Sequence, residues 1–330
     1  MATALIAPLD WGLGHASRSL ALAARLESEG WRVVLAGSGH SGAWMQEQRP
    51  DLDYLEFPSF TLTYSASNRQ VWAVLRSLPR LLACVIREHR AARRLVRLHG
   101  IDLRLSDNRF GLFGCGCRSI YLTHQVHIEL PRPYRWLSRG VDALHRSIMR
   151  RFDECWIPDF PKREQSLSGV LGHPDRLPAN ACYIGPLSRF RRQAPASGGG
   201  TLWLLSGVEP QRTLLERQLL GNYADSQGPV DLVRGTRSAG LPRHLPKGVR
   251  VWDLPDRQCL EDLIRRADRI VARSGYSTIM DLEAMGKLKV AEWRPTPGQP
   301  EQEYLAVWLS QQTIEYVEAA ERPHEWEFMP

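Results

Sequence analysis

The stretch Ala4-Leu-Ile-Ala-Pro-Leu-Asp-Trp-Gly-Leu-Gly-His-Ala-Ser-Arg18 opens the chain with a short apolar run that leads into a glycine-rich turn. Apolar residues at helical spacing follow as far as Leu26, and a second apolar run, Trp31-Arg-Val-Val-Leu-Ala36, comes next. We interpret these segments as a strand, a helix capped by Ser17, and a second strand. This order of elements is typical of a parallel sheet that is covered by helices.

The same order begins a second time after a break in composition. Residues 189–200 are rich in Arg, Pro, Gly and Ser, as linkers are, and an apolar run at 201–205 then leads into another turn. A chain of 330 residues is too long for one ordinary α/β domain and about right for two. We therefore predict an α/β fold of two Rossmann-like domains facing each other across a cleft, residues 1–187 and 188–330.

The amino-acid composition limits the class of protein to which the chain can belong. Hydrophobic residues make up 43% and charged residues 24%, as in soluble globular proteins, and no apolar run approaches the roughly 20 residues of a membrane span. The first residues lack the basic region of a signal peptide, and six scattered cysteines fit a reducing compartment. We expect a cytoplasmic protein.

The net charge of +7 is unevenly placed. Residues 1–187 hold 24 Lys and Arg against 17 Asp and Glu, whereas residues 188–330 hold 19 of each. The basic half would attract an anionic or lipid-linked acceptor, or the inner face of a membrane. The alternative is that this excess of Arg reflects a general preference for arginine in the composition and has no role in binding. Nucleic acid is not an expected partner, because no binding motif accompanies the charge.

The turn after the first strand carries a candidate catalytic residue. Its Gly12-Leu-Gly14 spacing is that of dinucleotide-binding turns, but Ser17 replaces the third glycine and no acid follows the second strand to hold a ribose. A neutral histidine at this sheet edge can take a proton from a hydroxyl group, because its pKa lies near working pH. We predict that His15 is such a base; the alternative is that it only caps the helix and fills the turn.

The most informative segment of the second half is Ala272-Arg-Ser-Gly-Tyr-Ser-Thr-Ile-Met-Asp281. It follows a predicted strand, and Ser274-Gly275 permits a tight turn. Ser277-Thr278 then opens a predicted helix, whose N–H and hydroxyl groups suit a diphosphate. Asp281 lies one turn further on, where a carboxylate can accept both hydroxyls of a ribose. A capping box of Ser277 or Thr278 with Asp281 is the structural alternative.

This segment resembles the nucleotide-sugar signature of GT-B glycosyltransferases, in particular family 28, whose members include the peptidoglycan enzyme that adds N-acetylglucosamine to lipid I. The resemblance covers most of the chain in order, although outside the motifs it is faint. It implies that the donor, a UDP-sugar, is bound by Ser206, Gly207, Leu254, Arg273, Ser274, Gly275, Ser277, Thr278, Asp281, Glu301 and Gln302.

On the acceptor side the resemblance implies roles for Gly14, His15, His124 and Gln125. The chain departs from the lipid I enzyme at Ser106-Asp-Asn-Arg109, which replaces a glycine-rich acceptor loop, so we expect a different acceptor. Asp107, Asn108 and Arg109 are candidates to bind it. Alternatively, Asp107 and Arg109 form a structural salt bridge with each other.

Together these features predict an inverting hexosyltransferase-like enzyme that moves a sugar from a nucleotide diphosphate to an acceptor hydroxyl. No cofactor or metal is expected, because the phosphate-binding groups neutralise the leaving group. A nucleotide-sugar hydrolase is one alternative, since Gly14-His15-x-x-Arg18 also resembles the loop of enzymes that cleave UDP from deoxy-sugars. A catalytically silent nucleotide-sugar-binding protein is another.

Overall fold

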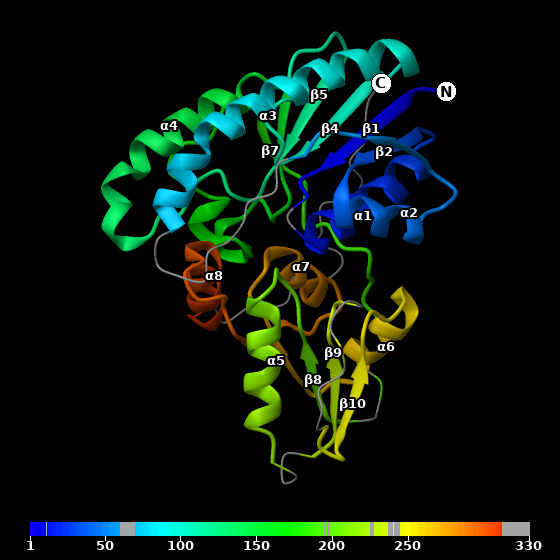
Figure 1. Ribbon diagram of the computed structural model, residues 1–330, viewed down its shortest axis with the longest axis vertical. Helices are drawn as coiled ribbons and strands as arrows, with labels where there is room; N and C mark the ends of the chain where they lie inside the picture. The colour runs from blue at the N-terminus through cyan, green and yellow to red at the C-terminus, as the bar shows by residue number, and fades with distance from the viewer. Residues whose placement is uncertain are drawn as a thin grey trace. The chain divides into compact units, whose positions relative to one another are not determined.

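Figure 1 shows the computed structural model of the chain. It describes residues 1–10, 12–59, 70–194, 196, 199–224, 228–236, 240 and 245–311, without the side chains of 70–78. The chain divides into two compact units, and the division falls between Arg189 and Phe190. The sequence-based boundary after residue 187 lies two residues before this division.

The first unit is built on a parallel sheet of seven strands in the order β3-β2-β1-β4-β5-β6-β7. Strands β1 and β2 are mostly apolar and buried, as expected for a sheet covered on both faces, and β4 is buried along its whole length although it includes Arg104 and Ser106. The strands are β1 (Thr3–Pro8), β2 (Arg32–Gly37), β3 (Asp53–Glu56), β4 (Leu103–Asp107), β5 (Arg118–Leu122), β6 (Glu154–Ile157) and β7 (Ala181–Tyr183).

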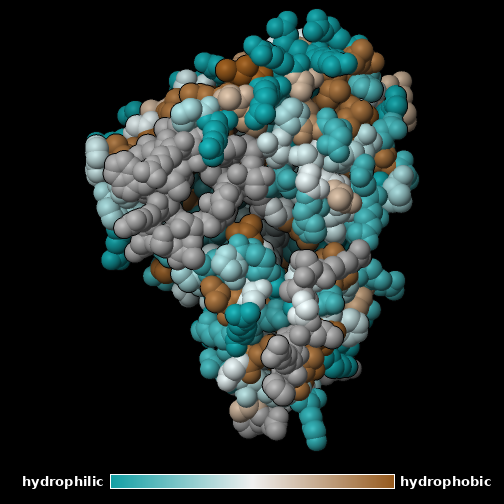
Figure 2. All heavy atoms as spheres, in the orientation of Figure 1, coloured by the Kyte–Doolittle hydropathy of each residue, from teal (hydrophilic) through white to brown (hydrophobic). Residues whose placement is uncertain are grey.

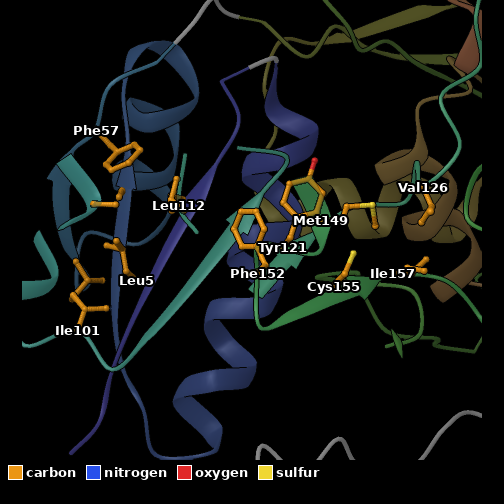
Figure 3. Packing of buried hydrophobic residues seen from close by; sticks show 14 residues of the cluster. Leu5, Phe57, Ile101, Leu112, Tyr121, Val126, Met149, Phe152, Cys155 and Ile157 are labelled. Carbon is orange, nitrogen blue, oxygen red and sulfur yellow. The ribbon is translucent and has the colours of Figure 1, made fainter. Parts of the chain in front are cut away.

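Helices cover this sheet, and they include α1 (Leu13–Ser28), α2 (Gly39–Gln48), α3 (Gln70–His99) and α4 (Ser138–Met149). Short 3-10 turns lie at η1 (Arg132–Leu137), η2 (Arg163–Gln165) and η3 (Gly169–Leu171). Helices α3 and α4 share one hydrophobic core, in which Ala92 and Met149 pack with Leu5, Tyr121 and Phe152 (Figure 3). Burying such side chains is the main source of stability for the sheet–helix contact.

The second unit repeats the plan on a smaller scale, with parallel strands in the order β10-β9-β8-β11-β12. The strands are β8 (Thr201–Leu204), β9 (Val230–Val233), β10 (Val249–Trp252), β11 (Arg269–Ala272) and β12 (Ala291–Trp293). The helices are α5 (Gln211–Gly221), α6 (Arg257–Arg266), α7 (Tyr276–Ala284) and α8 (Pro300–Gln311), with a 3-10 turn η5 (Leu288–Val290).

Each sheet has one place where the strand order reverses. In the first unit it lies between β1 and β4, whose ends pair Pro8 with Asp107. In the second unit it lies between β8 and β11, whose ends pair Leu204 with Ala272. Open α/β sheets bind ligands outside the carboxyl ends of the strands at such a switch point. The topology therefore marks one candidate site in each unit.

The predicted start of the first helix is wrong. The helix begins at Leu13, so Ser17 lies inside it and His15 lies in its first turn. Gly12 is the N-cap residue of this helix, and its φ of 104° is open to glycine at no steric cost.

Candidate functional site

The switch point of the first unit brings His15 and Asp107 together. His15 follows β1 in the first turn of α1, and Asp107 is the last residue of β4. His15 Nδ1 lies 3.0 Å from Asp107 Oδ1, and the two side chains are 17% and 2% exposed. The imidazole is therefore held by a buried carboxylate while part of its edge stays accessible.

Arg18 completes the cluster from one turn further along α1. Its Nε donates to Asp107 Oδ2 at 2.6 Å, and its NH2 group also bonds Asp107 Oδ1. Its NH1 group lies 3.5 Å from His124 Nδ1. Sequence reasoning did not assign Arg18 to the site. The available signal was its position three residues after His15, which places both side chains on one face of the helix.

The electrostatics of the cluster favour a neutral imidazole beside an ionised carboxylate. Burial is the largest cause that lowers the pKa of His15, and Arg18 adds to it, while Asp107 opposes the shift. Burial alone would raise the pKa of Asp107, but Arg18 and His15 outweigh it and hold that pKa well below its usual range. A neutral imidazole oriented by an anion is the arrangement of a general base.

Asn108 and Arg109, predicted on the acceptor side, make contacts within the protein. Arg109 is buried, and it donates to the carbonyl of Pro8 at 2.7 Å and to Glu88 at 2.9 Å. Asn108 accepts a hydrogen bond of 3.2 Å from Tyr121. The alternative of an Asp107–Arg109 salt bridge is wrong, because each residue is paired with a different partner. These contacts stabilise the strand end that presents Asp107.

The remaining acceptor-side candidates lie around the same cluster. His124 follows β5 and is buried, with Nε2 3.4 Å from the amide nitrogen of Gln125. Gly14 lies in the first turn of α1 beside His15. The strand order places β5 next to β4, which explains why His124 reaches Arg18.

The switch point of the second unit brings together two predicted phosphate-binding segments. Ser206-Gly207 follows β8, and Ser274-Gly275 follows the neighbouring strand β11. Gly207 has a φ of 100°, and the space where a Cβ would stand is empty, so a ligand can approach its backbone closely. The sequence placed both segments at strand ends, and the topology makes those ends neighbours.

Helix α7 starts differently from the predicted capping box. Gly275 is its N-cap residue and has no side chain to bond the first turn. Ser277 and Thr278 therefore stand at the second and third helical positions, and Asp281 lies further along. The first N–H groups of a helix have no partner within the helix and favour an anion. The capping-box alternative is wrong, because the N-cap position falls on a glycine.

Arg273 is buried and is bonded to backbone carbonyls of the first residue of α5 and of the segment after β12. Its NH1 group donates to Arg294 and Pro295 at 3.0 and 2.7 Å, and its NH2 group donates to Gln211 at 2.8 Å. Its Nε has no hydrogen-bond partner among the described residues, and burial lowers the pKa of this guanidinium. A buried cation in this condition favours a nearby anion.

The segment around the start of α8 is hydrogen-bonded to the Ser274-Gly275 turn. Gln302 accepts a hydrogen bond from the backbone of Thr296 at 2.9 Å through its amide oxygen, and its carbonyl accepts one from Ser274 at 2.7 Å. Glu301 precedes Gln302 on α8. Leu254 follows the edge strand β10 and is half-buried. Leu254 therefore follows a strand that lies two positions away from β8 at the switch point.

The chain has relatives in sequence and in structure. No family model matches the chain. A curated protein of Methanosarcina acetivorans, described as an uncharacterized glycosyltransferase, is 24% identical over 326 residues, covering 91% of this chain and 81% of that protein. The solved glycosyltransferase SnogD from Streptomyces nogalater is 14% identical with a TM-score of 0.58, covering 94% of this chain and 96% of its own. MurG of Acinetobacter baumannii is 12% identical with a TM-score of 0.52, covering 94% and 82%.

The chain has the GT-B fold. These structures confirm the predicted fold class. Together with the Methanosarcina acetivorans relative, they bear out the predicted resemblance to GT-B glycosyltransferases, including family 28, to which MurG belongs, and the predicted enzyme class. In this GT-B chain the His15 cluster and the Arg273 segment each occupy the switch point of one sheet. The individual roles of the site residues stay predictions.

Proposed function

We propose that the chain is an inverting, metal-independent glycosyltransferase that moves a sugar from a UDP-sugar to an acceptor hydroxyl. The observation that carries this proposal is the contact of His15 with Asp107 at the switch point, 3.0 Å between Nδ1 and Oδ1. A histidine paired in this way through Nδ1 presents Nε2 to a substrate. Asp107 stabilises the imidazolium that forms when Nε2 takes a proton.

The proposed reaction is a single displacement. Nε2 of His15 removes the proton of the acceptor hydroxyl as its oxygen bonds the anomeric carbon, and the bond from that carbon to the diphosphate oxygen breaks. The electron pair leaves with UDP, and attack from the opposite side inverts the configuration. The negative charge on the departing diphosphate is stabilised by the start of α7 and by the buried charge of Arg273. These groups supply positive potential, so the proposal needs no metal ion.

A UDP-sugar is favoured by a structural neighbour. UGT89C1 of Arabidopsis thaliana, 14% identical with a TM-score of 0.52 and covering 94% of this chain and 90% of its own, was solved with UDP-L-rhamnose. The same plant protein was also solved with quercetin, a small hydroxylated acceptor. For this chain we propose the same donor class, with Asp281 bonding the ribose and Glu301 and Gln302 bonding the sugar hydroxyls.

UDP is expected to raise the melting temperature of the protein more than ADP, GDP, CDP, dTDP or NAD do. At 100 times its dissociation constant a ligand stabilises the folded state by about 2.7 kcal/mol, which a thermal-shift assay detects readily. Asp281→Asn is expected to weaken the response, because an amide accepts ribose hydroxyls less strongly than a carboxylate does. Asp262→Asn on α6 is the matched control and should respond as the wild type does. A panel in which none of the nucleoside diphosphates raises the melting temperature would refute the donor assignment.

The hydrolase alternative uses the same cluster with water in place of the acceptor. The contact of Arg18 with both His15 and Asp107 supports it, because the sequence resemblance to those hydrolases rests on this His-x-x-Arg spacing. UDP release from a UDP-sugar that does not depend on any added acceptor would favour the hydrolase. Release that depends on an acceptor would favour the transferase.

We also propose that the first unit touches an anionic membrane surface through η1 and α4. Trp136 and Leu144 are 77% and 65% exposed, and exposed Arg132, Arg139 and Arg150 flank them. Figure 2 shows hydrophobic residues at the surface among hydrophilic ones along the edge where Figure 1 draws α3 and α4. Exposed apolar side chains bordered by cations are typical of helices that lie on anionic bilayers. No helix among the described parts of the chain is long and apolar enough to span a membrane.

The protein is expected to sediment with phosphatidylglycerol vesicles and much less with phosphatidylcholine vesicles, and salt should release it. Trp136→Ser with Leu144→Ser should reduce this binding, because both apolar anchors are lost. Leu214→Ser, an exposed leucine of α5 in the second unit, is the matched control. Equal binding to both lipids, or full binding by the double variant, would show that this face does not act as the contact.

A further inference from the structure

Three polar atoms of the His15 cluster form a small triangle. His15 Nδ1 lies 3.0 Å from Asp107 Oδ1 and 2.7 Å from the NH2 group of Arg18, and that NH2 group also bonds Asp107 Oδ1. A guanidinium group is only a donor and a carboxylate only an acceptor. Nδ1 cannot satisfy both neighbours at once, because in the neutral ring it carries either a proton or a lone pair.

The two choices have opposite consequences at the other ring nitrogen. If Nδ1 carries the proton, it donates to Asp107 and leaves a lone pair on Nε2. If Nδ1 accepts from Arg18, the proton sits on Nε2, and that atom cannot act as a base. Both bonds would be charge-assisted, the first through the ionised carboxylate and the second through the guanidinium, so the choice depends on which group still has bonding capacity to use. A carboxylate has about four acceptor positions, so Asp107 can accept from Nδ1 in addition to Arg18. Arg18, by contrast, already has both carboxylate oxygens as partners.

We propose that Arg18 is a positioning residue that selects the tautomer of His15. By donating hydrogen bonds to both oxygens of Asp107, Arg18 fixes the carboxylate in the orientation that accepts a hydrogen bond from Nδ1–H. The lone pair of the neutral ring is then on Nε2. Planar two-point contact of this kind is available to arginine and not to lysine. The catalytic meaning of this lone pair rests on the proposed function, but the tautomer itself does not.

The charges around the imidazole predict opposite changes in the pKa of His15 for two substitutions. A merely structural role of Arg18 would not produce this pattern. The groups that face His15 are Arg18 on its own helix, Asp107 from β4 and His124 from the segment after β5. Arg18 lowers the pKa of His15 and Asp107 raises it. Removing the arginine charge should therefore raise the pKa of His15, whereas removing the carboxylate charge should lower it further.

The test is long-range 1H–15N spectroscopy of protein labelled with 15N in its histidine rings, with His15 assigned by its loss in His15→Gln. In the wild type at neutral pH, His15 is expected to show a protonated Nδ1 and an unprotonated Nε2. Arg18→Gln is expected to give a mixture of tautomers and an upward shift of the pKa. Asp107→Asn is expected to shift the pKa downward. Arg18→Lys should keep the low pKa, because the charge stays, but should lose the single tautomer.

Arg25→Gln is the matched control, because it makes the same change on the same helix at a residue whose partner is Glu29. Its His15 signals should match the wild type. A wild-type spectrum with the proton on Nε2, or an Arg18→Gln spectrum identical to the wild type, would overturn the proposal. If Arg18→Gln does not fold, Arg18→Lys and Asp107→Asn still test the proposal. The UDP melting response is measured on the same samples, so loss of the proposed function and loss of the tautomer selection are read separately.

Discussion

Replacing His15 by alanine is expected to lower turnover by about 10²- to 10⁴-fold while leaving UDP binding unchanged. The substitution removes the group that takes the acceptor proton, whereas the phosphate-binding residues belong to the other unit of the chain. Turnover is measured as UDP release with the donor and acceptor pair that the wild type uses. UDP affinity is measured by thermal shift on the same preparations.

The pH dependence of kcat/KM separates a base from a residue that only shapes the turn. Burial lowers the pKa of His15, so the wild type should stay active as pH falls through about 6.5, the ordinary pKa of histidine, and lose activity only below it. Asp107 stays ionised throughout, because its pKa lies well below its usual range. The His15→Ala enzyme should lack this acidic limb. His99→Ala, an exposed histidine at the end of α3, is the control. Unchanged turnover in His15→Ala would remove the residue from the mechanism.

The sequence was sufficient to place His15 and Asp107 each at the carboxyl end of a strand. It did not show that they touch, because 92 positions separate them and contact depends on β4 lying next to β1. That neighbour relation comes from the crossover through α3, which returns the chain past β2 to the other side of β1. A single sequence contains no direct record of this return.

The fold gives two buried arginines different partners, although they look alike in the sequence. Arg109 stands two residues after Asp107, yet its partners are Glu88 and backbone carbonyls. Arg18 is 89 positions away from Asp107 and holds both of its oxygens. Local spacing predicts contacts along one helix or strand, whereas the partner of a buried charge is chosen by what else the fold places within reach. Helical spacing indicates that Arg18 lies near His15, but its contact with Asp107 could not be predicted in this way.

In the second unit, the contacts of Arg273 could be predicted only in part from the sequence. The motif correctly placed it after a strand and before a helix, at the switch point of the sheet. Its spacing did not reveal the three backbone carbonyls that receive its N–H groups. Those acceptors lie 62, 21 and 22 positions away, at the start of α5 and in the segment after β12. Direct contact of Arg273 with a diphosphate stays a prediction, and a second effect, through the loops, follows from the structure.

Arg273→Met is expected to lower the free energy of unfolding by about 2–4 kcal/mol and to weaken UDP binding by at least about tenfold. Hydrogen bonds from a charged donor each contribute about 1.5–3 kcal/mol, and three carbonyls lose theirs, although removing a poorly solvated cation recovers part of the cost. Arg273 bonds the first residue of α5, Gln211, and the segment that leads through Pro295 to α8, where Gln302 lies. Urea denaturation and UDP titration measure the two effects.

Two companion variants separate charge from geometry in this result. Arg269→Met removes a cation from β11, the strand that precedes Arg273, but that side chain is 56% exposed and paired with Glu292, so the expected loss is only about 0–1 kcal/mol. Arg273→Lys keeps the charge, but one ammonium group cannot bridge Gln211 and Pro295 as a guanidinium does. We therefore expect lysine to restore some UDP affinity through its charge and little stability. An Arg273→Met protein as stable as the wild type would show that the loops are held by other contacts. Full UDP affinity in that variant would show that neither its charge nor its loop contacts matter for the donor.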